Sequence, residues 1–328
     1  MAHHRPFYRS SAVSRIALIV GVDDYPANPL QGCVADATAV QDLLSKNSDG
    51  SANFSCRKID SKAHNITRSL LRREVANLFS KDDVDIALLF FAGHGSYNKT
   101  GGIFVTQDAS LGDEGIPMTE VIGLANRSKA KERVIILDCC HSGAIDELSS
   151  SIGTAALEEG VSILAACRST EFAMERGGRG LFSSNICDAL DGGAADVRGF
   201  VTIAAAYAYV VEVFTHWDQR ALFRASLSRV SSLRRAEPAV SDEKLIRIRA
   251  LFPEPDFVLP LSPNYEPTAE PRDIEKEEVF AILQQFRAAR LLEPVGNPHL
   301  YYAAMESKAC RLTPLGRFYW QAIASGKI

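Results

Sequence analysis

A thiol and an imidazole in this sequence stand where they could form a nucleophile and its base. Cys139 and Cys140 follow the apolar run Val134–Leu137, and His94 follows a second apolar run, Val84–Phe91. A free thiol has a pKa of about 8.5, so it needs a base to become a thiolate near neutral pH. The sequence therefore offers a candidate pair for nucleophilic catalysis.

The elements that precede these residues must position them. Both apolar runs lack polar alternation, which predicts strands buried on both faces of a parallel sheet. In open α/β sheets, ligands bind beyond the carboxyl ends of the strands. If the two strands are parallel, His94 and the cysteine pair emerge at the same edge. Gly93 and Gly95 flank the histidine and let the backbone approach a substrate closely.

Strands and helices alternate along the first two thirds of the chain. We expect further strands at residues 16–20, 54–59 and 161–167, a small hairpin near 101–105, and helices at 33–44, 67–78, 118–126, 180–190 and 202–213. Asn65 or Thr67 would cap the second of these helices. The alternation predicts an α/β fold with a parallel sheet and helices on both faces.

Composition limits the classes of protein to consider. The 328 residues fit one large domain or two modest ones, and the formal net charge of −4 argues against a general nucleic-acid binder. The seven cysteines show no disulfide-like spacing, and no apolar run reaches the length of about 18 residues that a membrane span needs. We therefore expect a reduced, cytoplasmic protein without a membrane segment, and we expect no metal or other cofactor.

Four stretches stand in order along the chain: Arg15–Gly21, Gly32–Ala37, Ala92–Gly95 and Asp138–Gly143. Together they resemble motifs of the metacaspases, a branch of the caspase family (clan CD, peptidase family C14). The first resembles the first strand of the family and the second its Gly-Cys-x-x-Asp-Ala motif, while the third is similar to its histidine motif and the fourth to its cysteine motif. Residues 94 and 140 are 46 positions apart, close to the caspase spacing of about 50. The resemblance covers residues 13 to 215 and implies the caspase-hemoglobinase fold and a bacterial cysteine endopeptidase.

The resemblance also implies catalytic roles. Cys140 would be the nucleophile and His94 its base, while the backbone N–H groups of Gly95 and Cys140 would hold the oxyanion. Cys139 is the rival nucleophile, but it stands where the family has a serine, so we expect it to be a spectator. His141 is a rival base; neighbouring strand-end residues tend to point apart, which favours His94.

A substrate pocket follows from the same resemblance. Four residues match positions that line the S1 pocket, which receives the side chain before the scissile bond: Asp36, Asp138, Cys33 and Ala92, the last of which replaces a family serine. Two carboxylates there imply cleavage after Arg or Lys and not after Asp. Each acid also has a simpler possible role, Asp36 at a helix N-terminus and Asp138 in a strand-end turn. Arg168–Glu171 resembles the segment whose backbone pairs with the bound peptide, and we expect the cysteines at 56, 167, 187 and 310 to be packing residues.

Two departures from the family predict how activity is controlled. Gly143–Cys167 contains no Lys or Arg, so an enzyme that cleaves after basic residues could not cut itself there, and we expect an active single chain. Ile116–Glu120 lacks the Asp pair with which many metacaspases bind calcium, although Asp146 and Glu147 remain near the nucleophile. Hard cations need several oxygen ligands, so we expect activity without calcium.

The C-terminal part changes in composition. We expect a flexible N-terminus at 1–13, a caspase-like peptidase domain at 14–250, a proline-rich linker at 251–272 and a small α+β module at 273–328 that resembles a winged helix. The module would contain a helix at 274–290, a short strand, a hairpin that includes 300–303, and a helix starting after Leu312–Thr313. The first helix carries three basic and three acidic residues between 275 and 290, a poor footprint for phosphates. A regulatory protein partner or an intramolecular contact is favoured over DNA.

Three functional classes remain open from the sequence. By analogy with bacterial relatives, the first is an effector protease in defence or cell-death-like signalling. The second is a non-enzymatic adaptor, a pseudopeptidase that signals through the C-terminal module. The third, a transcription regulator, would require specific DNA binding by residues 272–328.

Overall fold

The protein divides into two compact units in the computed structural model, which describes residues 14–98, 101–139, 156–167, 178–214 and 220–328. The first unit comprises the chain up to Ala195 together with Val201–Ala236, and the second comprises Asp196–Phe200 and Glu237–Ile328. The boundary therefore falls after residue 236, not near residue 250 as the sequence suggested. The stretch 251–272, expected to be a linker, belongs to the second unit.

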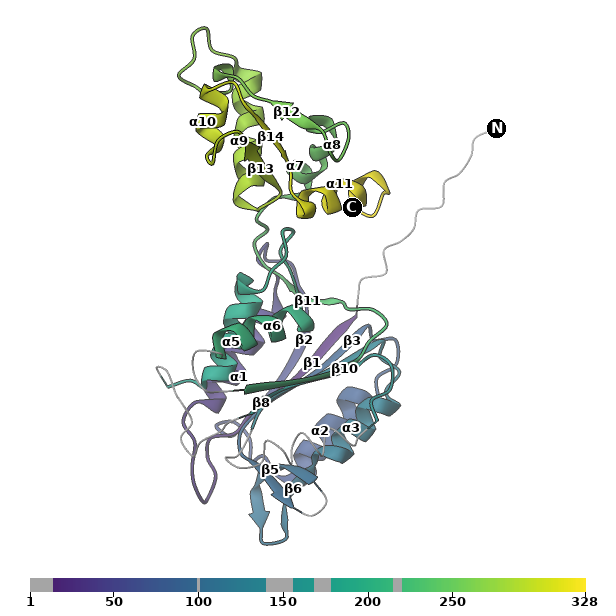
Figure 1. The fold of residues 1–328 in the computed structure, drawn as a ribbon. Coiled ribbons are helices and arrows are strands. Elements are labelled where there is room, and N and C mark those ends of the chain that lie inside the picture. Colours follow the sequence, from purple (N-terminus) through teal and green to yellow (C-terminus); the bar gives the residue numbers. More distant parts are fainter. Residues whose placement is uncertain (1–13, 99–100, 140–155, 168–177, 215–219) are drawn as a thin grey trace, which may run out of the picture. The chain divides into compact units, whose positions relative to one another are not determined.

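A six-stranded sheet forms the centre of the first unit (Figure 1). Its strand order is β10-β8-β7-β3-β1-β2, and the strands are β1 (Arg15–Gly21), β2 (Ser55–Asp60), β3 (Ile86–Ala92), β7 (Glu132–Asp138), β8 (Val161–Cys167) and β10 (Arg220–Ser226). All neighbours are parallel except β10, which runs antiparallel to β8. The mostly parallel α/β sheet is thus confirmed, and β10 is an edge strand that the sequence patterns did not indicate.

Helices cover both faces of this sheet, as Figure 1 shows. One face carries α1 (Cys33–Ser45), α5 (Leu181–Asp188) and α6 (Ile203–Phe214), and the other carries α2 (Arg68–Phe79) and α3 (Met118–Arg127). Successive strand residues point to opposite sides, so Leu18 joins the buried cluster under α2 and α3 while Ile19 joins the cluster under α1. This two-sided burial explains the unbroken apolar runs in the sequence.

The helix α2 also settles which residue caps it. The hydroxyl of Thr67 accepts a hydrogen bond from the N–H of Leu70 at 3.2 Å, as an N-cap residue does. Thr67, and not Asn65, is therefore the cap.

The strand register brings three strand ends to one carboxyl edge. Gly21 pairs with Ala92, and Ala92 pairs with Asp138. A methyl group on Gly21 would lie 2.5 Å from the carbonyl oxygen of Cys33, so the glycine permits the close approach of α1. The edge is therefore built from β1, β3 and β7, with the start of α1 packed against it.

Smaller sheets complete the first unit. A three-stranded antiparallel sheet follows β3 and consists of β4 (Gly95–Asn98), β5 (Gly101–Ser110) and β6 (Asp113–Pro117). It is more extensive than the small hairpin expected near 101–105. A π-helical turn (Ala189–Gly193) extends α5, and β9 (Phe200–Thr202) pairs with β11 (Ser232–Arg235).

The second unit surrounds a three-stranded antiparallel sheet of order β12-β14-β13. Its elements are α7 (Asp242–Ile246), α8 (Ile248–Leu251), β12 (Val258–Pro260), a 3-10 turn (Pro263–Tyr265), α9 (Ile274–Ala288), β13 (Leu292–Val295), α10 (Leu300–Met305), β14 (Ala309–Leu312) and α11 (Pro314–Ala324). The expected helices at 274 and after Thr313 are present, and the Thr313 hydroxyl caps α11 by accepting the N–H of Gly316 at 3.1 Å.

Two expectations for this unit were wrong. The proline-rich stretch is ordered within the unit because apolar residues of this stretch enter the core: Phe252 and Leu261 are buried, and β12 pairs with β14. Residues 300–303, expected in a hairpin, form the helix α10, since Leu300, Ala303 and Ala304 are buried at helical spacing. The likeness to a winged helix stays a prediction.

Candidate active site

His94 lies at the carboxyl edge of the sheet, between β3 and β4, where Tyr25 holds it. The His94 backbone N–H donates to the Tyr25 hydroxyl at 2.9 Å, and the two rings lie 4.6 Å apart. The same hydroxyl donates to the carbonyl oxygen of Val105 at 3.2 Å. Burial raises the pKa of Tyr25 far above its usual value, so the phenol stays neutral. Tyr25 thus ties the histidine to the small sheet.

The imidazole of His94 also has a fixed partner for one nitrogen. Its Nε2 lies 2.6 Å from the carbonyl oxygen of Asn28. A carbonyl oxygen can only accept a hydrogen bond, so in the neutral ring Nε2 carries the proton and Nδ1 is left as the base. Asn28 has a φ of 56°, in the left-handed region that asparagine tolerates better than most residues. The local backbone therefore sets the tautomer.

The glycines around His94 touch the end of β7. The N–H of Gly93 donates to the carbonyl oxygen of Asp138 at 3.2 Å. A methyl group on Gly95 would lie 1.8 Å from the carbonyl oxygen of Cys139, so only glycine fits this contact. The structure thus places His94 beside the strand end that leads to the predicted nucleophile. Cys140 lies outside the described residues, and so does His141, the rival of His94 as the base.

The rival nucleophile, Cys139, is described, and it is buried. Only 3% of it is exposed, and it packs in the apolar cluster under α2 and α3. A substrate carbonyl cannot reach a thiol in that position without rearrangement of the core.

Asp36 and Asp138 converge on one point, the backbone of Gly180. They are 1% and 4% exposed, and a methyl group on Gly180 would lie 3.0 Å from an oxygen of Asp36 and 2.7 Å from an oxygen of Asp138. Asp36 Oδ2 accepts the N–H of Gly180 at 2.9 Å. Asp138 Oδ2 accepts the hydroxyl of Ser183 at 2.6 Å and its N–H at 3.3 Å. The residues predicted to line a pocket are therefore neighbours, although their role with a substrate stays a prediction.

Asp36 does lie in the first turn of α1, but another acid satisfies the free N–H groups there. Asp23 accepts the N–H groups of Cys33 at 2.8 Å and Val34 at 3.2 Å, and so satisfies the free donors at the start of α1. Burial raises the pKa of Asp36 to about 6, and the charge of Asp138 adds to this, against the lowering effect of the bond from Gly180. With a pKa of about 6, the carboxyl of Asp36 is mostly ionised at neutral pH and can pair with a cation.

A cation of the chain itself contacts Asp36. Arg179 Nε donates to Asp36 Oδ1 at 3.0 Å, and Arg179 Nη2 donates to the sulfur of Cys187 at 3.1 Å. Burial raises the pKa of the Cys187 thiol to about 11, so the sulfur is a neutral partner. The carboxylate of Asp36 is therefore paired with a guanidinium of the chain itself.

Sequence reasoning missed five residues of this site: Tyr25, Asn28, Arg179, Gly180 and Ser183. The arginine stands in a Gly-Arg-Gly tripeptide at 178–180, which marks a close backbone approach. Nothing local in the sequence indicates that this approach is to Asp36.

The remaining predicted residues lie at the same edge. Cys33 is half-buried at the first position of α1, and Ala92 is buried beside Asp138 in the register. Gly95 is the first residue of β4, but its role with an oxyanion depends on Cys140. Arg168–Glu171, the predicted peptide-pairing segment, lies outside the described residues. Lining roles for Cys33 and Ala92 stay predictions.

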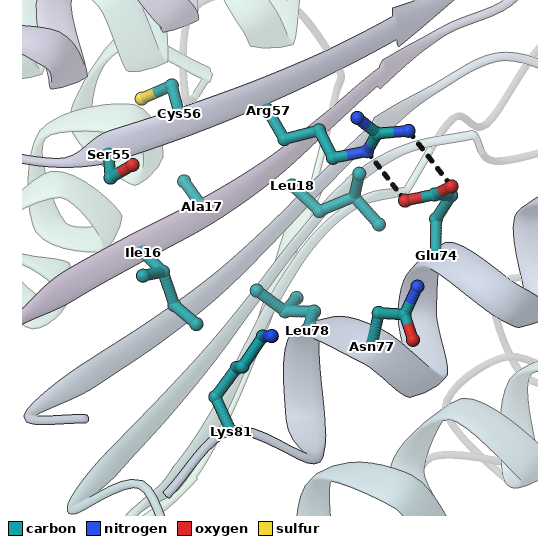
Figure 2. A pocket seen from close by; sticks show the side chains of 10 residues that line it. All are labelled: Ile16, Ala17, Leu18, Ser55, Cys56, Arg57, Glu74, Asn77, Leu78 and Lys81. Carbon is teal, nitrogen blue, oxygen red and sulfur yellow. Dashed lines mark hydrogen bonds and ion pairs between the residues drawn. The ribbon is translucent and has the colours of Figure 1, made fainter. Parts of the chain in front are cut away.

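A cavity elsewhere in the first unit does not include these residues. It has a volume of about 190 Å³ and lies between the first halves of β1 and β2 and the helix α2 (Figure 2). Figure 2 shows Arg57 and Glu74 paired at this cavity. The Nε of Arg57 lies 2.6 Å from Oε2 of Glu74. Because it involves the amino halves of the strands, it is separate from the carboxyl edge that carries His94.

The described parts of the chain contain no cluster of three or more His, Cys, Asp or Glu side chains suited to a metal ion. In the stretch compared with the family's calcium motif, Glu120 pairs with Arg72 at 2.7 Å, while Asp146 and Glu147 lie outside the described residues. Within those same parts, no helix is long and apolar enough to cross a membrane.

Comparisons with known proteins extend the sequence resemblance. The family model for the peptidase C14 caspase domain matches residues 14–225. Among curated proteins, none matches this chain. Protein GSU0716 from Geobacter sulfurreducens has a similar solved structure, at 16% identity and a TM-score of 0.50, over 68% of this chain and 100% of that chain.

Two caspase structures are also similar. They are pro-sf-caspase-1, at 14% identity and a TM-score of 0.48 over 71% of this chain and 100% of that chain, and drICE, at 11% identity and a TM-score of 0.45 over 69% and 94%. At such identities a structural likeness concerns the fold alone.

Proposed function

Because the chain belongs to the caspase family of cysteine peptidases, we propose that Cys140 and His94 form its catalytic dyad and that it cleaves proteins after Arg or Lys. The family match makes the chain a cysteine-type peptidase, a hydrolase that acts on protein substrates. The proposal goes beyond the family match in naming the catalytic dyad and the preference for a basic substrate residue. The observation that carries them is the convergence of Asp36 and Asp138 beside the strand end that precedes Cys140.

The proposed reaction is acyl transfer to the thiolate. Cys140 would attack the scissile carbonyl, with its proton taken by Nδ1 of His94, and His94 would return that proton to the leaving amine. Water would then hydrolyse the thioester with the same base. The bond from His94 Nε2 to Asn28 supports this, because it leaves Nδ1 as the acceptor. The burial of Cys139 supports Cys140 as the nucleophile.

Charge supports the choice of a basic substrate residue. Asp36 and Asp138 both lie near Gly180 and both are buried, so each would repel a third carboxylate. An acidic substrate residue would therefore bind with a penalty and without a compensating donor. A guanidinium would relieve the repulsion and can bond to a carboxylate through two parallel N–H groups, which favours Arg over Lys.

The test is a set of peptides that differ only in the residue before the scissile bond: Arg, Lys, citrulline or Asp. The full chain should cleave after Arg and Lys, and Cys140→Ala should abolish cleavage while Cys139→Ser retains it. Asp138→Asn and Asp36→Asn should each lower kcat/KM for the Arg peptide while the thiol still reacts with iodoacetamide. Efficient cleavage after Asp, or unchanged Arg cleavage in both Asn variants, would refute the pocket.

For the second unit, we propose a regulatory contact with protein, because residues 275–290 carry three basic and three acidic side chains. A role in bacterial defence or cell-death-like signalling would follow if such a contact controls cleavage. The adaptor alternative predicts no cleavage of any peptide in the set, which the same experiment decides.

A further inference from the structure

Arg179 is the one feature of the acid pair that the proposed function leaves without a role. We propose that Arg179 is a specificity-determining residue: its guanidinium occupies Asp36 as an intrachain cation, and a basic substrate side chain binds by displacing it. This inference rests on the proposed cleavage after Arg or Lys and adds the competitor that the entering side chain meets.

The backbone of Arg179 is held in place while its side chain can leave. A methyl group on Gly32, before the start of α1, would lie 3.1 Å from the carbonyl oxygen of Gly178 and 3.2 Å from Cα of Arg179. The next residue, Gly180, is bound to Asp36 through its N–H. The Arg179 side chain is 30% exposed, whereas that of Asp36 is 2% exposed. Solvent therefore reaches part of the Arg179 side chain, so the side chain has room to rotate away from the carboxylate.

Displacement is favoured over co-occupancy because both carboxylate oxygens of Asp36 already have partners. Oδ1 accepts the Nε–H of Arg179 at 3.0 Å, and Oδ2 accepts the N–H of Gly180 at 2.9 Å. A second guanidinium bound to Asp36 would lie close to that of Arg179, and two like charges at such a short distance repel strongly. Arg179 also donates to the neutral thiol of Cys187, which offers no charge to hold a second cation. The entering side chain and Arg179 therefore compete for one carboxylate.

Competition of this kind lowers apparent affinity by the fraction of molecules that are open. If Arg179 occupies Asp36 in about nine molecules of ten, a basic ligand binds about tenfold more weakly than it would to the open site. Arg179→Gln removes the charge and keeps a planar polar group. We expect it to lower KM for the Arg peptide by about three- to tenfold with kcat unchanged, and to leave the citrulline peptide unaffected.

Direct binding separates this proposal from the proposed function. Agmatine carries a guanidinium and no peptide, and its Kd can be measured by calorimetry on the full chain with Cys140→Ala as the background. We expect Arg179→Gln to lower that Kd by the same factor as KM. The matched control is Arg72→Gln, which removes the same charge from an ion pair between α2 and α3 and should change neither value.

Each result decides one of the two proposals. If the wild type does not cleave after Arg or Lys, the proposed function fails, while tighter agmatine binding in Arg179→Gln would still support displacement. If the wild type does cleave after Arg but agmatine binds Arg179→Gln equally or more weakly, Arg179 is part of the binding wall and the displacement proposal is overturned. Should the Gln variant not fold, Arg179→Lys decides, with an expected gain of about twofold, because lysine keeps the charge and loses the bond that Nε makes. No gain in a folded Lys variant would overturn the proposal.

Discussion

Gly95→Ala should separate the histidine from the predicted nucleophile while leaving the fold intact. A methyl group at this position would lie 1.8 Å from the carbonyl oxygen of Cys139, a contact that real side chains keep beyond 3.0 Å. The neighbour is backbone at the end of β7, so it cannot swing aside as a flexible side chain would. The backbone at Gly95 and the backbone at Cys139 must therefore move apart by about 1.2 Å.

The size of the effect follows from that displacement. Misplacement of a catalytic group by about 1 Å can cost about 100-fold in rate. Overpacking at one buried position costs about 1–3 kcal/mol of the free energy of unfolding, which a domain of this size can withstand. We therefore expect kcat to fall about 100-fold, with KM nearly unchanged because Asp36 and Asp138 are not touched.

The assay is single-turnover cleavage of the Arg peptide, with thermal unfolding followed in parallel. Gly123→Ala in α3 is the matched control, because its methyl would meet only the end of the flexible Arg127 side chain, 3.3 Å away. Alanine at a helix interior should be neutral or stabilising there. Wild-type kcat in a folded Gly95→Ala enzyme would refute the close contact between Gly95 and the backbone of Cys139.

Four further predictions concern the groups around this edge. Tyr25→Phe removes the hydroxyl that accepts the N–H of His94 at 2.9 Å, so kcat measured in single turnover should fall about tenfold. An unchanged kcat would show that this hydrogen bond does not position the histidine. Asn28→Gly should keep activity because glycine adopts a φ of 56° freely, whereas Asn28→Val should lose most of it in the same assay; equal rates would contradict the role of this backbone carbonyl. The pKa of about 6 at Asp36 predicts that KM for the Arg peptide rises as pH falls below 6, because only the ionised carboxylate binds a cation. Arg179 lowers that pKa, so in Arg179→Gln the rise of KM should begin at a higher pH. Because the pKa of Asp36 is raised in the fold, the stabilising contribution of this one group is fully present below its unfolded pKa of about 3.9 and is lost as pH rises through 6. Asp36→Asn should therefore remove this part of the Tm profile, and an unaltered profile would contradict the shift.

Much of the edge that carries His94 could be predicted from local sequence. The apolar runs before His94 and Cys139 have no polar alternation, and both form central parallel strands with Ala92 and Asp138 in register. Period and burial determine such strands, so one short window contains the information. The rule that ligands gather at carboxyl strand ends then places the residues together.

The partners of those residues could not be predicted because they come from distant parts of the chain. Tyr25 is 69 positions from His94, and Gly180 is 144 positions from Asp36. Each contact depends on the packing of a loop whose own sequence has no periodic pattern. The same reason applies to β10, whose strand character depends on the edge of β8 that it covers.

The C-terminal stretch shows a different failure, in which a correct local rule gave a wrong conclusion. Proline does exclude regular helix and central strand, and Pro260 accordingly lies in an outer strand, β12. The error was to equate prolines with an extended linker. Phe252 and Leu261 are buried in the core of the second unit, and burial of apolar side chains outweighs the turn-forming tendency of the residues between them.

Asp138 connects the two halves of the site through different atoms. Its backbone carbonyl accepts the N–H of Gly93, next to His94, while its side chain accepts the hydroxyl of Ser183, at the start of α5. A change of the side chain would therefore alter the proposed pocket without removing the bond from Gly93, which supports His94. Gly180 has no such freedom, because a methyl group there would meet both carboxylates. Arg179, one residue earlier, presents only its side chain to the acids, so it is the position at which preference for the substrate residue can change while the arrangement around His94 is retained.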